Sequence, residues 1–216
     1  MATVPILAGD EWDSSMGVEG HEAKDGEDMQ AFMNAVSPGY FATMKIPILE
    51  GRDFRESDAK EKTDVAIVNH KFAEHFFPGA SAIGKRLSEG TGPQAKLTIQ
   101  IVGVVADALY EGPREGVHRQ VYVPNWGSNS SVFYVRAQTS SSSAFNTIRE
   151  NVHQLDAGIP VYDLKTVEAQ LDETLLSDRL VAMLSAGFGA LATLLAAIGL
   201  YGVMAFVVAR RRKELG

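Results

Sequence analysis

The feature that most constrains this chain is a run of 30 consecutive residues without a charge, from Leu180 to Ala209. About 20 apolar residues in a helix are enough to cross the hydrocarbon core of a bilayer. Thirteen of the 30 residues are Leu, Ile, Val or Phe, and at roughly 0.45 kcal/mol each they favour insertion by up to about 6 kcal/mol. A buried core helix is the alternative, but such a helix is usually shorter and keeps a polar stripe. The run therefore predicts a transmembrane helix.

Four cations, Arg210, Arg211, Arg212 and Lys213, follow this run directly. Basic residues beside a transmembrane helix favour the cytoplasmic side, so we expect a cytoplasmic C-terminus and an extracytoplasmic region over residues 1–179. Before position 210 the chain has 16 basic and 26 acidic residues. This balance argues against attraction to anionic lipid and against a nucleic-acid partner. The absence of cysteine excludes disulfides, thiol nucleophiles and Cys-ligated zinc or iron–sulfur clusters.

The region before the helix alternates between strand and helix patterns. Val65–Val68 reads as a buried strand, and Asn69 can cap a helix that places Phe72, Phe76 and Phe77 on its apolar face. Residues 1–30 are polar, acidic and poor in pattern; within them Glu19–Gln30 is expected to form a loop or short hairpin and not a core element, and ordered structure is expected to begin with Ala31–Val36. Further strands are expected at 46–54, 83–87, 97–107, 120–124, 131–138 and 159–164, with a short helix after 37–41 and an amphipathic helix over 140–158. This order predicts an α+β fold, a mixed sheet with packed helices, in one domain over residues 1–165.

A second helical pattern begins at Thr166, and no Gly or Pro interrupts it before Gly187. A helix over residues 167–209 would be roughly 64 Å long, about twice the thickness of the hydrocarbon core. We expect a stalk at 166–182, a transmembrane helix at 183–209 and a cytoplasmic segment at 210–216. Small residues recur every four positions and favour close contact with another helix; a plain lipid-facing surface is the alternative. These residues are Ser185, Gly189, Thr193 and Ala197.

No catalytic, cofactor-binding or metal-binding residue stands out. The sequence has neither a phosphate-binding G-x-x-x-x-G-K-[ST] loop nor a G-x-S-x-G elbow, and the glycines of 187–192 lie inside the apolar run. His70 and His75 are five residues apart, which is poor spacing for one metal ion. Asp53 and Asp58 could pair as carboxylates, but a solvated turn rich in arginine is the simpler interpretation. We therefore predict a protein that is not an enzyme and carries no cofactor.

Several segments together resemble a known family of permeases. Residues 36–54, 65–87, 101–107 and 122–124 are similar to the MacB-like periplasmic core domain, and residues 178–216 look like the start of an FtsX-like permease domain. The matching motifs are VSPGYFATMKIPILEGRDF, VAIVNHKFAEHFFPGASAIGKRL, IVGVVAD, YVP and DRLVAMLSAGFGALATLLAAIGLYGVMAFVVARRRKELG. The resemblance covers nearly all of residues 31–216, in order, and is closest to permeases abundant in acidobacteria.

The resemblance implies a permease subunit of an ABC transporter in a bacterial inner membrane. Such permeases have four transmembrane helices and a separate ATPase, and they convert ATP-driven dimerisation of that ATPase into motion of their periplasmic domains. It also implies a homodimer or heterodimer of permeases, a periplasmic partner protein, and contact between the ATPase and Arg210–Glu214. Because relatives extend beyond both ends of this sequence, we expect a fragment. The alternatives are a membrane-anchored binding or adaptor module without an ATPase, and a membrane-tethered hydrolase.

Overall fold

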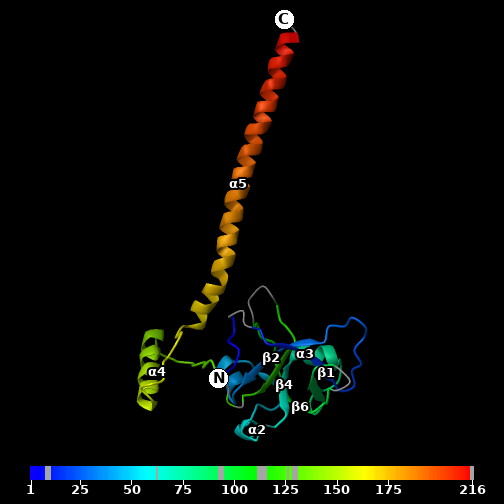
Figure 1. Ribbon diagram of the computed structural model, residues 1–216, viewed down its shortest axis with the longest axis vertical. Helices are drawn as coiled ribbons and strands as arrows, with labels where there is room; N and C mark the ends of the chain where they lie inside the picture. The colour runs from blue at the N-terminus through cyan, green and yellow to red at the C-terminus, as the bar shows by residue number, and fades with distance from the viewer. Residues whose placement is uncertain are drawn as a thin grey trace. The chain divides into compact units, whose positions relative to one another are not determined.

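The computed structural model describes residues 1–7, 11–61, 63–91, 95–110, 116–125, 127 and 131–214, and side chains at all of these except 59, 174, 177–179 and 205–214. The chain forms two compact units, Met1–Thr166 and Val167–Gly216. The first unit contains a sheet with short helices, and the second is a single long helix, α5 (Figure 1).

The first unit has seven named strands and four helices in its described residues. In chain order they are β1 (Asp13–Val18), β2 (Gln30–Val36), α1 (Tyr40–Met44), β3 (Ile48–Gly51), α2 (Glu56–Lys60), β4 (Val65–Asn69), α3 (His70–Phe76), β5 (Arg86–Glu89), β6 (Ile99–Val105), β7 (Gln120–Pro124) and α4 (Ser141–Leu155). The helix α5 spans Val167–Glu214.

The strand order is β3-β6-β4-β7-β2-β1-β5, and β5 also pairs with β6. Six strands therefore close into a ring, while β3 pairs only with the end of β6, over Gly103–Val105. The pairs β2–β7 and β4–β6 are parallel, and the other pairs are antiparallel. The sheet is mixed and carries helices, which confirms the predicted α+β class.

Every residue of β4 is buried, because both faces of this strand are covered. Ala66 and Val68 pack in an apolar cluster with residues of α3, whereas Val65 and Ile67 pack in a second cluster with residues of α1. A strand buried on both faces reads as a continuous apolar run rather than an alternating one. The continuous apolar run explains why this strand could be predicted clearly from the sequence.

The predicted cap of α3 is confirmed. The Asn69 side-chain oxygen accepts a hydrogen bond from the Phe72 backbone N–H at 3.1 Å and another from the Gln120 backbone N–H at 2.9 Å. The Asn69 amide nitrogen donates to the His118 backbone oxygen at 2.8 Å. One buried side chain therefore both begins α3 and fixes the start of β7 beside it.

The expectation that ordered structure begins only at Ala31 is wrong, whereas nearly all of Glu19–Gln30 is a connection between two strands, as expected. The strand β1 lies inside the sheet, between β2 and β5, and Ala2, Val4 and Met16 are buried. Asn34, which is fully buried in β2, forms hydrogen bonds with the backbone of Thr3 and Val4. The contacts that order this segment come from residues about 30 positions away, so the local pattern carries no sign of them.

Three strand predictions also differ from the structure. The strand expected at 83–87 begins only at Arg86. Residues 131–138 form only an isolated bridge between Val132 and Ala2, and residues 159–164 form no strand. These segments have strand-like composition, but a strand also needs a free neighbouring edge, and closure of the ring occupies most edges of the sheet.

The amphipathic helix predicted at 140–158 is present as α4, but none of its residues is buried. Leu155, on its apolar face, is 84% exposed. Periodicity therefore identified the helix correctly and did not show whether its apolar face is covered.

The helix α5 is continuous over 48 residues, which corresponds to about 72 Å. Within it, Leu180–Met204 is long and apolar enough to cross a membrane, by length and composition, and none of that stretch is buried. Large apolar side chains on this stretch, such as Phe188 at 69% exposure, are open to their surroundings. Such a surface suits a hydrocarbon environment better than water.

Candidate functional site

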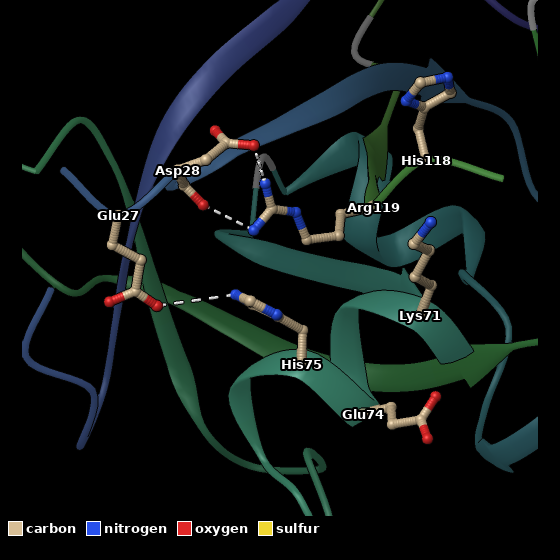
Figure 2. Close-up of a pocket in the computed structure, with 7 residues that line it drawn as sticks. All are labelled: Glu27, Asp28, Lys71, Glu74, His75, His118 and Arg119. Carbon is tan, nitrogen blue, oxygen red and sulfur yellow. Dashed lines mark hydrogen bonds and ion pairs between the residues drawn. The ribbon is translucent and has the colours of Figure 1, made fainter. Parts of the chain in front are cut away.

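The first unit has an open pocket of about 560 Å³ lined mainly by charged and imidazole side chains. Figure 2 shows that these side chains come from three separate segments: the connection between β1 and β2, the helix α3, and the residues directly before β7. The lining residues are Glu27, Asp28, Lys71, Glu74, His75, His118 and Arg119.

The positions of these residues follow from the fold around them. On α3, Lys71, Glu74 and His75 share one side of the helix because residues three and four apart are neighbours. The Asn69 cap holds the His118 backbone beside the start of this helix. Because β1 and β2 pair antiparallel, the chain reverses direction between them. The last residues of that connection, Glu27 and Asp28, lie at the pocket beside α3.

Arg119 holds one wall of the pocket in place. Its guanidinium forms an ion pair with the Asp28 carboxylate and donates to the Asp28 backbone oxygen at 2.6 Å. The same guanidinium lies 5.6 Å from the centre of the Phe76 ring, within the range of a cation–π contact. Residues 91 positions apart are thus joined by one side chain.

Glu27 is shared between two imidazoles. One of its carboxylate oxygens lies 2.9 Å from His21 Nε2 and 3.7 Å from His75 Nε2. The backbone N–H of Lys24 and the two imidazoles together hold the pKa of Glu27 below its usual value, against a smaller opposing effect of burial. Burial, and then the Arg119 cation, lower the pKa of His75.

Two carboxylates of this pocket already have partners within the protein. The pocket lining contains no serine, threonine or cysteine, and its Glu27 and Asp28 carboxylates are engaged by His21 and Arg119. Over the part of the chain that the structure describes, no group of three or more His, Cys, Asp or Glu residues could hold a metal ion. The sequence signal for this pocket was weak, because its residues are dispersed over three segments.

The histidines that were considered for a metal site contact different carboxylates. His70 lies 3.8 Å from Asp107 and 3.9 Å from Glu74, both on its Nδ1 side, whereas His75 faces Glu27 across the pocket. They do not form one pair, in agreement with their spacing.

The interpretation of Asp53 and Asp58 as a solvated turn needs correction. Asp58 is only 6% exposed and accepts two hydrogen bonds from Arg52, at 2.6 and 3.1 Å, and one from the Arg55 backbone N–H at 2.8 Å. Asp53 accepts from the Phe54 backbone N–H at 2.7 Å. The two carboxylates have separate structural partners and do not face each other as a catalytic pair.

Replacement of Asp58 by asparagine is expected to lower the free energy of unfolding by about 1–3 kcal/mol, because the Arg52 cation loses its buried partner. The pKa of Asp58 is held below its usual value, chiefly by the Arg52 hydrogen bonds. The stabilisation is therefore complete above the usual pKa and is lost as pH falls through the lowered one. Urea unfolding of both proteins at pH 7 and in steps below pH 4 checks this. A difference that stays constant through the acid range would contradict it.

The residues predicted on the long helix all lie in α5. Ser185, Gly189, Thr193 and Ala197 are exposed, and Thr193 Oγ1 donates to the Gly189 backbone oxygen at 2.8 Å. The backbone of Arg210–Glu214 continues the helix to its end, and the side chains of this segment lie outside the described residues.

Comparison with known proteins gives a match over most of the chain. Residues 3–172 match the family described as the MacB-like periplasmic core domain. The chain is 23% identical over 180 residues to the macrolide export ATP-binding/permease protein MacB of Nitrosomonas europaea, covering 78% of this chain and 27% of that protein. It is 20% identical over 199 residues to the pyoverdine export ATP-binding/permease protein PvdT of Pseudomonas aeruginosa, covering 88% of this chain and 29% of that protein. The chain thus spans less than a third of the length of these relatives.

Among solved structures, the periplasmic region of MacB from Actinobacillus actinomycetemcomitans is similar at a TM-score of 0.48 and 15% identity, over 67% of this chain and 64% of that one. The extracellular domain of the ABC-type transporter YknZ from Gram-positive bacteria is similar at a TM-score of 0.36 and 19% identity, over 78% of this chain and 72% of that one.

Proposed function

Because the chain belongs to the MacB-like periplasmic core domain family, we propose that it is part of an ABC-type export permease of a bacterial inner membrane. The observation that carries this proposal is continuity: the family match ends at residue 172, inside α5, and the same helix contains the apolar stretch Leu180–Met204. A core domain of this family is thereby joined, without a break in the helix, to a segment able to cross a membrane.

The proposed action is the transmission of motion between the two sides of the membrane. ATP hydrolysis by a partner ATPase would move the cytoplasmic end of α5, and the helix would pass this motion to an extracytoplasmic core at residues 1–165. No Gly or Pro occurs between Val167 and Ala186, so this part of the helix has no residue that favours a kink. Residues 166–182 would serve as a stalk, 183–209 as the transmembrane helix and 210–216 as the start of a coupling segment.

The topology proposal places residues 1–179 outside the cytoplasm and the C-terminus inside. It depends on the four cations at 210–213, which favour the cytoplasmic side, and on the acidic balance of the rest of the chain. A second permease subunit, identical or different, would pack on α5 along the small residues, and a periplasmic partner would bind the core. The small residues are Ser185, Gly189, Thr193 and Ala197.

Replacement of all four cations at 210–213 by glutamine tests the coupling role. We expect the four-fold variant to lose most of the ABC ATPase that co-purifies with the unchanged chain from detergent-solubilised membranes, because the cations are the proposed contact. Protease protection in intact spheroplasts, measured on the same variant, separates a lost contact from an inverted topology. A matched control replaces four exposed cations of the first unit, Lys24, Lys45, Lys60 and Arg149, by glutamine.

Unchanged recovery of the ATPase with the four-fold variant would show that Arg210–Lys213 do not provide the contact. Failure of the unchanged chain to bring down any ABC ATPase would favour the second function, a membrane-anchored binding or adaptor module. The continuity of domain and helix fits that function equally well.

A further inference from the structure

The last part of the first unit, residues 131–166, carries most of that unit's exposed apolar side chains. Among the described residues of the unit, six of the eleven exposed large apolar side chains lie in this segment, although it makes up only about a fifth of the unit. Apolar surface concentrated in this way is typical of an interaction site. The six residues are Phe133, Val135, Leu155, Ile159, Val161 and Tyr162, with exposed fractions from 37% to 84%.

The start of this segment is held on the rest of the unit by one of its sides. Ala2 and Val132 exchange two backbone hydrogen bonds, at 2.8 and 2.9 Å. Two residues further on, the Tyr134 hydroxyl accepts from the Ile6 backbone N–H at 2.9 Å. The segment is therefore fixed in place through Val132 and Tyr134.

The opposite side of the same stretch has no such contacts. Phe133 and Val135 are 73% and 62% exposed, whereas Val132 and Tyr134 are half-buried. Backbone N–H and C=O groups alternate in direction along an extended chain, so those of Phe133 point away from Ala2, towards the other edge. Over the described residues, no strand pairs with that edge. The stretch thus offers a strand edge together with two apolar side chains, which suits the addition of another strand.

The rest of the segment is similarly uncovered. Residues 159–164 have the composition of a strand but pair with no strand over the described part of the chain. Between the two stretches, the apolar face of α4 is only half-buried at Phe145, Ile148 and Val152. The segment therefore has the order strand, helix, strand, without the neighbouring strands that such a unit needs.

We propose that residues 131–166 are the surface through which two copies of this chain join. In the joined pair, residues 131–138 of each copy form an added strand, and the six apolar side chains become buried. A surface that meets its own copy about a two-fold axis must be complementary to itself. An antiparallel pair of identical strands meets this condition, because each edge supplies the donors and acceptors that the other requires.

The charge of the segment favours a second copy as its partner. Residues 131–166 contain three basic and three acidic residues, whereas residues 1–130 contain 12 basic and 19 acidic residues. Two copies of the acidic part repel each other, but the balanced segment approaches its own copy without this cost. The same balance gives the segment no attraction to an anionic membrane surface.

The exposed area is also sufficient for a stable pair. At the areas that large apolar and aromatic residues have when fully exposed, the six side chains present roughly 600 Å². An interface of standard size buries about 800 Å² on each partner, and a little more than half of that area is apolar. These six side chains alone would supply the apolar part of such an interface.

This inference adds a contact between first units to the proposed pairing of two permease subunits. It rests on that proposal only in that two chains lie in the same membrane. It does not depend on an ATPase, on transport or on the packing of α5, and the variants below keep these apart.

Chemical crosslinking in membranes from cells that express the chain alone gives the test. The chain has no cysteine, so a single introduced cysteine reports only its own position. A short bismaleimide is the reagent, because its spacer tolerates a small offset between the paired strands. We expect Phe133→Cys and Val135→Cys, made separately, to give about tenfold more linked dimer than the control, because an interface raises the effective concentration of the two thiols. The matched control is Ala23→Cys, at an exposed position of the connection between β1 and β2.

A second pair of changes tests whether the whole segment takes part. Ile159→Asp with Tyr162→Asp, made in the Phe133→Cys chain, should lower the linked dimer to the level of the control, because carboxylates would be buried without partners. Leu49→Asp with Leu97→Asp, at exposed apolar positions outside the segment, is the matched control and should leave the dimer unchanged. If the Ile159 and Tyr162 variant does not fold, the single cysteines still decide the outcome.

A change in α5 separates this surface from the proposed packing of that helix. Gly189→Leu with Ala197→Leu fills the row of small residues, and the dimer linked through Phe133→Cys should persist. Its loss would show that α5 alone brings the copies together and would overturn the proposal.

Equal linkage at Phe133→Cys, Val135→Cys and Ala23→Cys would also overturn it, as would the absence of a linked dimer. Linkage to a different protein in place of a second copy would do so as well. A chain that forms this dimer but recovers no ABC ATPase would retain the proposed surface and lose the proposed transport function.

Discussion

Replacement of Leu191 and Leu195 by arginine is expected to remove the 216-residue chain from the membrane. Both positions lie near the middle of Leu180–Met204. Each change exchanges a favourable leucine for a cation, at about 3–4 kcal/mol in the centre of a bilayer. Two such changes cost roughly 6–8 kcal/mol, which meets or exceeds the insertion energy of about 6 kcal/mol available from the whole apolar run.

Carbonate extraction of membranes from cells that express the chain alone is the measurement. The unchanged chain should remain in the pellet, and the double variant should appear in the supernatant or in aggregates. The matched control places the same two arginines at Phe133 and Leu155, which are 73% and 84% exposed in the first unit, and should remain in the pellet. Retention of the Leu191 and Leu195 variant would mean that α5 is not held by hydrocarbon, and the permease proposal would lose its basis.

Asn34→Leu is expected to lower the free energy of unfolding of the first unit by about 3–5 kcal/mol. The Asn34 side-chain oxygen accepts from the backbone N–H groups of Thr3, at 3.2 Å, and Val4, at 3.1 Å. Its amide nitrogen donates to the Val4 backbone oxygen at 2.9 Å and to the Tyr110 hydroxyl at 3.1 Å. Leucine has a similar size but removes the partner of the Val4 backbone N–H and oxygen in the core, where each such group costs about 1–3 kcal/mol. The Thr3 N–H keeps its second hydrogen bond, to the Ala35 backbone oxygen at 2.9 Å.

Urea unfolding in detergent, followed by the fluorescence of Trp12, measures this loss. Trp12 packs against two of the apolar clusters of the first unit, so its emission reports that unit. Asn146→Leu, at an exposed position of α4, is the matched control and should change stability by less than about 0.5 kcal/mol. A loss below 1 kcal/mol in Asn34→Leu would show that residues 1–7 are not held by this side chain.

Asn34 also shows why part of the core could not be predicted from the sequence. The first 30 residues have an acidic composition, and their buried positions become apparent only when Asn34 and the neighbouring strands are in place. In contrast, Val65–Asn69 and the cap of α3 were predictable, because a buried run and a capping side chain act within a few residues of each other.

The candidate pocket was not predictable for a related reason. His75 was visible as one of two closely spaced histidines, but its partner Glu27 lies 48 positions earlier in the chain. The ion pair between Asp28 and Arg119 joins positions 91 apart. Charged residues that are dispersed in this way resemble solvated surface residues until the sheet brings them together.

The sequence by itself determined the continuous helix, its apolar stretch, the basic segment after it and the mixed α+β class, because these depend on composition and on spacing within one element. Only the tertiary structure decided that six strands close into a ring, that the N-terminal segment is part of the core, and that Glu27 lies between His21 and His75. The physical reason is that strand pairing and buried polar contacts depend on which distant segments meet. A residue's neighbours along the chain do not record the neighbours it acquires on folding.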